Sequence, residues 1–564
     1  MSLGGVLANA SAALSTAQYQ VALSTTNVAN ASTAGYTSKT YAATSQTSIL
    51  GLSTGTVTRA TNSYLLKSVI TSAAQAGYDT AVDDTLSRYD TLLGGTDDGS
   101  DIASLTSALS TALTSLASGS STTSASDVVS AASELADGLR DLSSGIQSLR
   151  KDADSAIAAT VTQINDLLTT ISGLNARIVS GQGDAASLAD ARDTAMTSLA
   201  SLIGVTSYED ASGRLNVYTT SGQQLVGDTA SVLGFSTSAV SASTTYPDSL
   251  SGVTVNGHDV TSSLTTGELG GLLALRDTIL PAEQAALDTL AAGVIDAVNT
   301  AAASSAAYPP SSLTSSLSVA SGDALSLTGS LTVVQMTTSG TSTGSTTLDL
   351  SGISTVADLM TALNGVSGVT ASLTDGKLTI SSASGGIALD TSAALTSSGE
   401  TLNAYLGFND VFTGSDASTI RVSAGLLSDS SKLATSTLNS SAAVNASAVA
   451  SGGTGGVQAM LTALGADRAL PASGKLSAQT TSLLFYASNV LASAASTVSK
   501  ASSAAALSTA LSESYQNSLS NVTGVNLDEQ TALVSLYQQQ YEITAQLMSA
   551  IKDMFDTLVS MAAS

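Results

Sequence analysis

The chain has 564 residues, of which 11% are charged, and its 18 basic and 43 acidic residues give a formal net charge of −25. A chain this acidic is repelled by nucleic acids and by anionic membrane surfaces, so we expect neither as a partner. The sequence contains no cysteine, which excludes disulfides, thiolate catalysis and cysteine-ligated zinc. At about 150 residues per domain, the length predicts three or four domains.

The first predicted helix, residues 3–28, has the spacing of a helix that packs against another helix. Its small and apolar residues recur at alternating steps of four and three: Leu3, Leu7, Ala10, Leu14, Ala17, Val21, Ser24 and Val28. The same segment lacks the basic start and the unbroken apolar run of a cleaved secretion signal. We therefore expect either a cytoplasmic protein or export by a route without a cleaved signal.

Residues 26–39, TNVANASTAGYTSK, follow this helix and are too polar for a core. Asn27 and Asn30 are predicted to cap the helix or to bond nearby backbone as it ends. Gly35 permits a backbone conformation that other residues resist, and Tyr36 offers an anchor against a neighbouring element. On physical grounds alone, a helix-ending loop explains the stretch.

The interior predicts a helical rod. Apolar residues from Val128 to Ile178 keep a heptad rhythm that is broken only by two successive steps of four at 149–153–157. A helix of about 50 residues is about 75 Å long, which exceeds a compact globule. Further helices are predicted at 60–93, 184–203, 267–304 and 477–520.

Two regions have a strand pattern. Residues 204–262 contain short alternating runs, with Asn256-Gly257 as a hairpin signal. Residues 306–448 are rich in Ser, Thr and Gly, alternate in the same way, and contain a short helix opened by Thr355.

The last predicted helix repeats the spacing of the first. Its seam consists of Leu533, Tyr537, Gln540, Thr544, Leu547, Ile551, Met554, Leu558 and Met561, and a second stripe consists of Leu536, Met548, Phe555 and Val559. Asn526 is placed to cap this helix, with Asp528 and Glu529 at its positive end. An amphipathic surface helix would explain either terminus alone. Two matched helices favour pairing with each other, with apolar face left for other subunits.

The sequence offers little for catalysis. The single histidine, His258, lies beside a turn, and we expect it to be solvated. Asp97, Asp98 and Asp101 lack the spacing of a calcium loop. Asp83 and Asp84 are predicted to lie on the solvated face of a helix. The glycine run 452–456 lacks the lysine of a phosphate loop and is predicted to be a flexible junction. We therefore expect no enzyme, no cofactor and no metal site.

Several motifs resemble bacterial flagellar axial proteins, the family of rod, hook and hook-associated subunits. The signature N-x-x-N-x-x-T-x-G-Y of this family matches Asn27, Asn30, Thr33, Gly35 and Tyr36. The usual Arg after the Gly-Tyr pair is Lys39 here. Further blocks resemble the hook-associated members at the hook–filament junction, and they cover residues 188–193, 267–277, 406–408, 412–418 and 524–529. The last block contains Asn526, Asp528 and Glu529. The weakest coverage is at residues 306–350.

The resemblance implies an α+β multidomain fold. We expect paired terminal helices in an inner domain (1–45 with 521–564) and a long helical-bundle rod domain (46–305 with 449–520) that includes the hairpin region near 204–262. A β-rich outer insertion is expected at 306–448. The residues expected to mediate assembly are Leu3, Leu7, Leu14, Val21, Val28, Leu533, Tyr537, Leu547, Ile551, Met554, Phe555 and Leu558.

The resemblance also implies partners and a location. It predicts self-assembly into a ring or tubular layer between the hook protein on one side and the second junction protein and filament on the other. Export would use the flagellar type III apparatus without a cleaved signal, with a chaperone covering the C-terminal helix, and would deliver an extracellular flagellar protein. No membrane insertion is expected, because no window holds about 18 uninterrupted apolar residues.

Three alternatives are weighed. One is an enzyme within the insertion 306–448, which would need a convergent acid, base or metal cluster, and that segment contains no His and no Cys. A hook or rod protein shares the signature, although the long heptad helix argues against it. A secreted Ser/Thr-rich adhesin or surface-layer protein would fit the composition, and its mark would be an N-terminal secretion signal or a C-terminal anchor.

Overall fold

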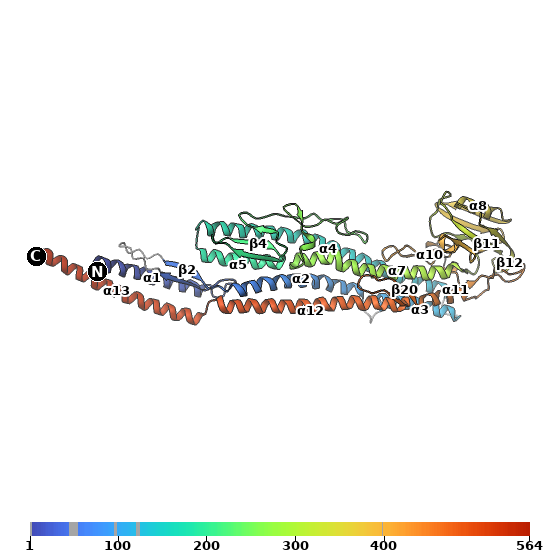
Figure 1. The fold of residues 1–564 in the computed structure, drawn as a ribbon. Helices are drawn as coiled ribbons and strands as arrows, with labels where there is room; N and C mark the ends of the chain where they lie inside the picture. The colour runs from blue at the N-terminus through green and yellow to red at the C-terminus, as the bar shows by residue number, and fades with distance from the viewer. Residues whose placement is uncertain (1–2, 44–54, 95–98, 120–123, 398, 564) are drawn as a thin grey trace.

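The computed structural model describes residues 3–43, 55–94, 99–119, 124–397 and 399–563, and the fold is α+β as predicted. The molecule is elongated (Figure 1). The first and last helices lie at one end, long helices form the middle, and a β-rich unit lies at the other end.

The terminal helices are α1 (Leu3–Ala29) and α13 (Leu527–Ala563), which pack against each other. Beside α1, strand β1 (Lys39–Ala43) pairs antiparallel with β2 (Gly55–Arg59), with Lys39 opposite Arg59. The chain therefore brings its two ends together at the same end of the molecule (Figure 1).

The rod is a bundle around the largest hydrophobic core of the described residues. Its helices are α2 (Ser63–Leu93), α3 (Ile102–Ala117), α4 (Ala125–Val179), α5 (Ala185–Leu202), α6 (Gly267–Ala274), α7 (Leu280–Ala303), α11 (Gly455–Gly465) and α12 (Leu483–Thr523). The predicted 128–178 helix is confirmed as α4, whose heptad residues from Val128 to Ile171 are largely buried. The helix predicted over 267–304 contains a π turn at Leu275–Ile279.

Two details of the rod differ from the sequence prediction. Helix α3 was not predicted, because its buried Ile102, Leu109 and Leu113 are separated by Ser and Thr that resemble a loop. The glycine run 452–456 is not a flexible junction but leads into α11. A Cβ on Gly456 would collide with the carbonyl of Ala434, so close packing requires glycine there.

The region 205–259 forms two small sheets beside α4. One contains β3 (Val205–Glu209), β4 (Leu215–Thr219) and β5 (Gln224–Val226), and the other contains β6 (Leu233–Gly234), β7 (Thr254–Val255) and β8 (His258–Asp259). The predicted hairpin is confirmed: Asn256 and Gly257 adopt φ values of 50° and 85° between β7 and β8. His258 is exposed, as expected of a turn residue.

The outer unit forms around a second core. Its main elements are β10 (Leu313–Thr314), β11 (Leu327–Met336), β12 (Ser342–Asp349), α8 (Val356–Asn364), β13 (Val369–Thr374), β14 (Lys377–Ser382), β15 (Gly386–Asp390), β16 (Ala394–Thr396) and α9 (Leu402–Leu406). The strand orders are β12-β11-β15 and β10-β14-β13, all antiparallel, and Thr355 caps α8 as predicted.

The chain returns to the rod just after α9. Phe408 belongs to the outer core, whereas Val411 and Phe412 belong to the rod core. Between them lies Asp410, which is buried and accepts a 2.6 Å hydrogen bond from Ser316 Oγ. Residues 411–434, which the sequence placed in the outer insertion, contribute their buried side chains to the rod. Their short elements are β17 (Phe412–Thr413), β18 (Arg421–Val422) and α10 (Ala424–Ser428).

Short strands complete the two junctions of the rod. β9 (Ser305–Ala306) pairs with β19 (Ser436–Thr437) beside α11, and β20 (Arg468–Leu470) pairs with β21 (Gln479–Thr481) just before α12.

No helix in the described ranges combines the length and the apolar character needed to cross a membrane. Within the same ranges, no group of three or more His, Asp or Glu side chains is placed to hold a metal ion.

Candidate assembly site

The contact between the terminal helices is built on small residues. On α1, Ala10, Ala17 and Ser24 are buried at steps of seven. Such residues allow two helix backbones to approach closely. On α13, Thr544 and Ile551 are buried in the same rhythm. The heptad spacing therefore produces a helix pair between the two ends of one chain.

The predicted assembly residues divide into two groups. Ile551 is buried, and Leu14, Val21, Val28, Leu533 and Tyr537 are half-buried. Five others are exposed in the single chain: Leu7, Leu547, Met554, Phe555 and Leu558. The side chain of Leu3 lies outside the described residues.

The contact face of α13 is rotated slightly from the predicted seam. Tyr541 and Met548 are half-buried, whereas Gln540 and Leu547, the predicted positions one residue earlier, are exposed. Thr544 and Ile551 of the predicted seam are buried as expected, and Gln530, which precedes the predicted seam, is buried as well.

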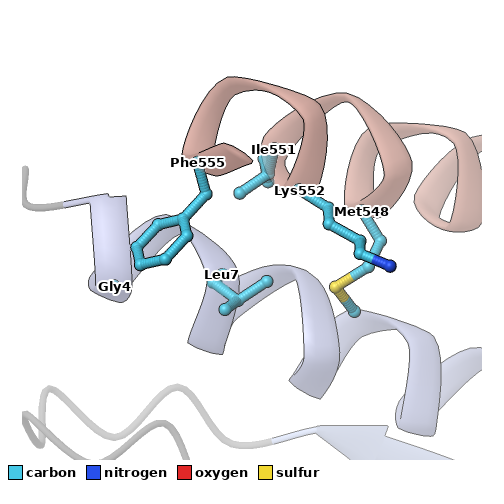
Figure 2. A pocket seen from close by; sticks show the side chains of 6 residues that line it. All are labelled: Gly4, Leu7, Met548, Ile551, Lys552 and Phe555. Carbon is cyan, nitrogen blue, oxygen red and sulfur yellow. The ribbon is translucent and has the colours of Figure 1, made fainter. Parts of the chain in front are cut away.

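Beyond Ile551, α13 extends past the first turn of α1 and its apolar side chains face solvent. These are Met554, Phe555, Leu558, Val559 and Met561. Where α1 begins, a cavity of about 310 Å³ opens between the helices, lined by Gly4, Leu7, Met548, Ile551, Lys552 and Phe555. Figure 2 shows Phe555 extending from α13 toward Gly4, with Leu7 between the two helices. The lining of this cavity is apolar apart from Lys552.

Asn27 joins the stretch after α1 to the last helix. Its side-chain Nδ2 donates to the carbonyl of Lys39 at 2.8 Å and to Gln530 Oε1 at 3.0 Å. Its Oδ1 accepts from the amide of Lys39 at 3.1 Å and from the hydroxyl of Tyr36 at 2.9 Å. Both donors and both acceptor positions of a fully buried amide are thus used. Asn27 is therefore a junction between three segments rather than a simple helix cap.

The other signature residues shape the loop. Asn30 Nδ2 donates to the carbonyl of Thr26 at 2.9 Å, and Thr33 Oγ1 donates to Asn30 Oδ1 at 3.4 Å. Gly35 has φ +75°, and a Cβ there would overlap Thr194 Oγ1 of α5. Only glycine satisfies both the left-handed backbone and the close approach to α5.

Tyr36 is covered by Lys39, whose Nζ lies 3.6 Å from the ring centroid. Burial raises the pKa of Tyr36, and the nearby carboxylates of Asp190 and Asp184 raise it further. The hydroxyl therefore stays protonated and donates to Asn27. Tyr36 therefore anchors the loop to other residues of its own chain.

Asp190 of α5 holds the same loop from the other side. Its carboxylate accepts from Lys39 Nζ at 2.6 Å, from Thr37 Oγ1 at 2.6 Å and from Arg59 at 3.2 Å. Lys39 is buried, so its charge depends on this partner. This cluster fastens the terminal helices and the β1–β2 ribbon to the rod.

Asp193 extends the cluster by one turn of α5, with Arg59 Nη1 at 2.5 Å. Burial raises the pKa of Asp193, although Arg59 and Arg192 oppose the shift. Conversely, the two carboxylates raise the pKa of Arg59 despite its burial, with Asp193 contributing more than Asp190. Because the two acids lie three residues apart on one helix, both can face Arg59.

Arg192 points away from this cluster and into the rod. Its guanidinium donates to Asn175 Oδ1 at 3.2 Å and to the carbonyl of Gly213 at 2.7 Å, and it pairs with Glu209. Asn175 in turn bonds the backbone of Leu215 in both directions. The block at 188–193 therefore joins the terminal domain on one face and the β3–β4 hairpin on the other.

Sequence reasoning identified this block but not its role, and it missed Arg59. The sequence did contain a signal for Arg59: the chain has only 18 basic residues, so each of them is a candidate partner for a carboxylate.

Asn526 lies at the start of the last helix. Its Oδ1 accepts hydrogen bonds from the amides of Asp528 and Glu529 at 3.0 and 3.3 Å, so it caps α13 as predicted.

Residues 86–308 match the family described as flagellar hook-associated protein FlgK helical domain. The matched range is 223 of the 564 residues, which is less than half of the chain. The family is a structural one, which agrees with the prediction of a protein that is not an enzyme.

Two further similarities accompany this match. The chain is 33% identical over 156 residues to flagellar hook-associated protein 1 of Escherichia coli (strain K12), which is 27% of this chain and 28% of that relative. The fold is similar to the flagellar hook junction protein FlgK from Burkholderia pseudomallei, with a TM-score of 0.51 and 18% identity, covering 81% of this chain and all of that one.

The FlgK helical-domain match contains the rod side of the Asp190 cluster and leaves the terminal helices outside. Asp190, Arg192 and Asp193 all lie within residues 86–308. Lys39, Arg59 and Asn27, which belong to the terminal side of the same contacts, precede that range. The cluster therefore lies where the matched FlgK domain meets the terminal part of the chain.

Proposed function

We propose that this chain is a structural subunit of the bacterial flagellum at the junction between hook and filament. One observation carries the proposal: helices from opposite ends of the chain pair with each other and leave an apolar overhang, in a chain that contains the FlgK helical domain. The solved relative with a similar fold is described as a hook junction protein.

In this proposal, the paired helices α1 and α13 form an inner tube wall, together with residues 1–45 and 521–564. The rod forms an outer layer, and the β-rich insertion lies outermost. The exposed Phe555, Leu558 and Met554 and the cavity beside Gly4 receive neighbouring subunits of the same ring, the hook protein or the next junction protein. Helix faces suit a joint between a curved and a straight structure, because packed helices slide by small steps without losing burial.

The same overhang supports export with a chaperone. An isolated subunit with this apolar stripe would aggregate, so we propose that a chaperone covers α13 before assembly. Export through the flagellar type III apparatus, without a cleaved signal, would then deliver the subunit to the outside of the cell.

Deletion of the gene tests the junction role. We expect hooks of normal length, no filaments, and flagellin released into the medium. Re-expression of the full chain should restore filaments. A deletion strain with normal filaments would contradict the proposal.

Truncation tests the role of the terminal helices. A chain lacking residues 1–45 and 521–564 should stay soluble and monomeric but fail to restore filaments in the deletion strain. A truncated chain that restores filaments would show that the termini are not the assembly site.

A further inference from the structure

Helix α12 carries an exposed apolar ridge that has no partner among the described residues. Leu507 is 71% exposed, Leu511 is 48% exposed and Val522 is 58% exposed. With the exposed Lys500 and the half-buried Ser518, they recur at steps of seven and four, which places all five on one helix face. Exposed apolar side chains aligned on one helix face in this way mark a contact surface.

A groove lies on the opposite side of the same helix. It has a volume of about 750 Å³ and runs between α2, α5, α6 and α12. Its wall on α2 consists of small residues including Ala73, Gly77 and Thr80, and its rim carries Asp84, Glu268 and Glu513. Gln516 of α12 lines the groove and follows Leu507 by nine residues, or two and a half turns, so the ridge and the groove face opposite directions.

The groove and the ridge are level along the rod. Ser38 hydrogen-bonds both Thr523, where α12 ends, and Ala60, just before α2 begins, so the two packed helices run antiparallel from the same height. Lys500 lies 23 residues before Thr523, and Asp84 lies 22 residues after Asn62, the N-cap of α2. At an equal rise per residue, Lys500 is level with Asp84, and by the same count Leu507 is level with Gly77.

We propose that the α12 ridge of one copy docks into the α2–α12 groove of the next copy at the same height. Leucine side chains enter a wall of small residues, and the Lys500 cation meets the acidic rim at Asp84. Because the two surfaces differ and lie on opposite sides, the contact is head-to-tail, and it closes into a ring when the rotation between copies at one height divides the circle evenly. This inference rests on the proposed function, in that it names the lateral partner of an assembling subunit.

Cross-linking of engineered cysteines tests the contact, since the native chain has none. The double variant Leu507→Cys/Thr80→Cys is expressed in the deletion strain, and its flagella are isolated and treated with a short bismaleimide. We expect a ladder of multimers of this chain on a denaturing gel. The single variants should give dimers at most, because each chain then carries one thiol.

A matched control keeps Leu507→Cys and moves the second thiol to the opposite face of α2 with Thr71→Cys. Thr71 is exposed and nine residues before Thr80. We expect no ladder from this pair. If the first pair impairs swimming, Leu511→Cys/Thr80→Cys tests the same contact, and restored swimming shows that the junction role is intact.

The outcomes separate the two proposals. Swimming cells whose flagella give no ladder with either pair would overturn the lateral contact while leaving the junction role intact. A ladder of equal yield from the Thr71 control would also overturn it, as would a cross-link from Leu507→Cys to a different protein. Failure of the junction role would instead appear as normal filaments in the deletion strain.

The charge pair gives an independent check. Lys500→Glu should lower the cross-link yield of the double variant by up to about fivefold, the range of an exposed ion pair. Adding Asp84→Lys should restore the yield. An unchanged yield in Lys500→Glu, or no recovery in the charge swap, would contradict the proposed register.

Discussion

Asn27 donates a 3.0 Å hydrogen bond to Gln530 across 503 positions of sequence, and the same amide holds Tyr36 and both backbone groups of Lys39. One side chain thus connects the first helix, the loop that follows it and the last helix. Because the site is buried, its loss leaves several polar groups without partners.

Replacing Asn27 tests this junction. Asn27→Ala should lower the free energy of unfolding of the terminal helices by about 2–4 kcal/mol, because each orphaned buried polar group costs about 1–3 kcal/mol. Hydrogen exchange of α13 measures the effect. The matched control Asn30→Ala removes a more exposed amide from the same signature and should cost less than about 1 kcal/mol. Equal effects of the two substitutions would contradict the junction role.

Replacing Asp190 tests the fastening of the terminal domain to the rod. Asp190→Asn leaves the buried Lys39 cation without its partner, and we expect a loss of about 3–5 kcal/mol. The control Asp152→Asn breaks the exposed ion pair with Arg88 and should change stability by less than about 1 kcal/mol. Thermal unfolding followed by circular dichroism compares them. A loss below that of the control would show that Lys39 finds another partner.

Replacing Gly35 adds two free-energy costs, one from the positive φ of the backbone and one from overlap with Thr194, and a control glycine separates them. Gly35→Ala must adopt a positive φ and overlap Thr194, so we expect a loss of more than about 2 kcal/mol. Gly181→Ala has φ +67° with no atom near its Cβ, and should show the backbone cost alone, about 1 kcal/mol. Unfolding in denaturant measures both. Equal losses would mean that α5 moves aside at no cost.

Asp410 makes the joint between rod and outer unit sensitive to pH. Burial raises its pKa to about 6, and the hydrogen bond from Ser316 only partly offsets this. The folded state therefore holds the proton more tightly than the unfolded state, whose pKa is 3.8. Stability from this group is full below about pH 4 and is lost as the pH rises through about 6, by about 3 kcal/mol in total.

Asp410→Asn isolates this contribution, because the amide stays neutral. We expect the variant to be more stable than the native chain at pH 8, with the difference shrinking toward pH 4. Thermal unfolding across this range measures the difference between the two proteins, so that the other carboxylates cancel. A constant difference at all pH values would contradict the raised pKa.

The sequence predicts the long helices well, because their apolar residues repeat at regular helical spacing. Helix α4 has Leu, Ile and Val at nearly every contact position, so its extent can be predicted to within a few residues. Helix α3 could not be separated from a loop, because Ser and Thr occupy most of its exposed positions. On α13, Gln530 is buried where its side chain meets Asn27 of α1, which local hydrophobicity does not reveal.

The candidate site was predicted in part. The signature residues Asn27, Gly35 and Tyr36 were identified from their spacing, and Asn526 from its place before a helix. The residues that these side chains contact could not be predicted, because Asp190 is 151 positions from Lys39 and Gln530 is 503 positions from Asn27. Contacts at such separations depend on the whole fold rather than on any local pattern.

The pairing of α1 with α13 also sets an order of events. A contact across 503 positions carries a large loop-closure cost, so we expect the terminal pair to form after the local helices. Any process that delivers the polypeptide from its N-terminus leaves α1 without its mate until the final residues arrive. The terminal pair thus reports on delivery, because it forms only after α13 has followed the rest of the described chain.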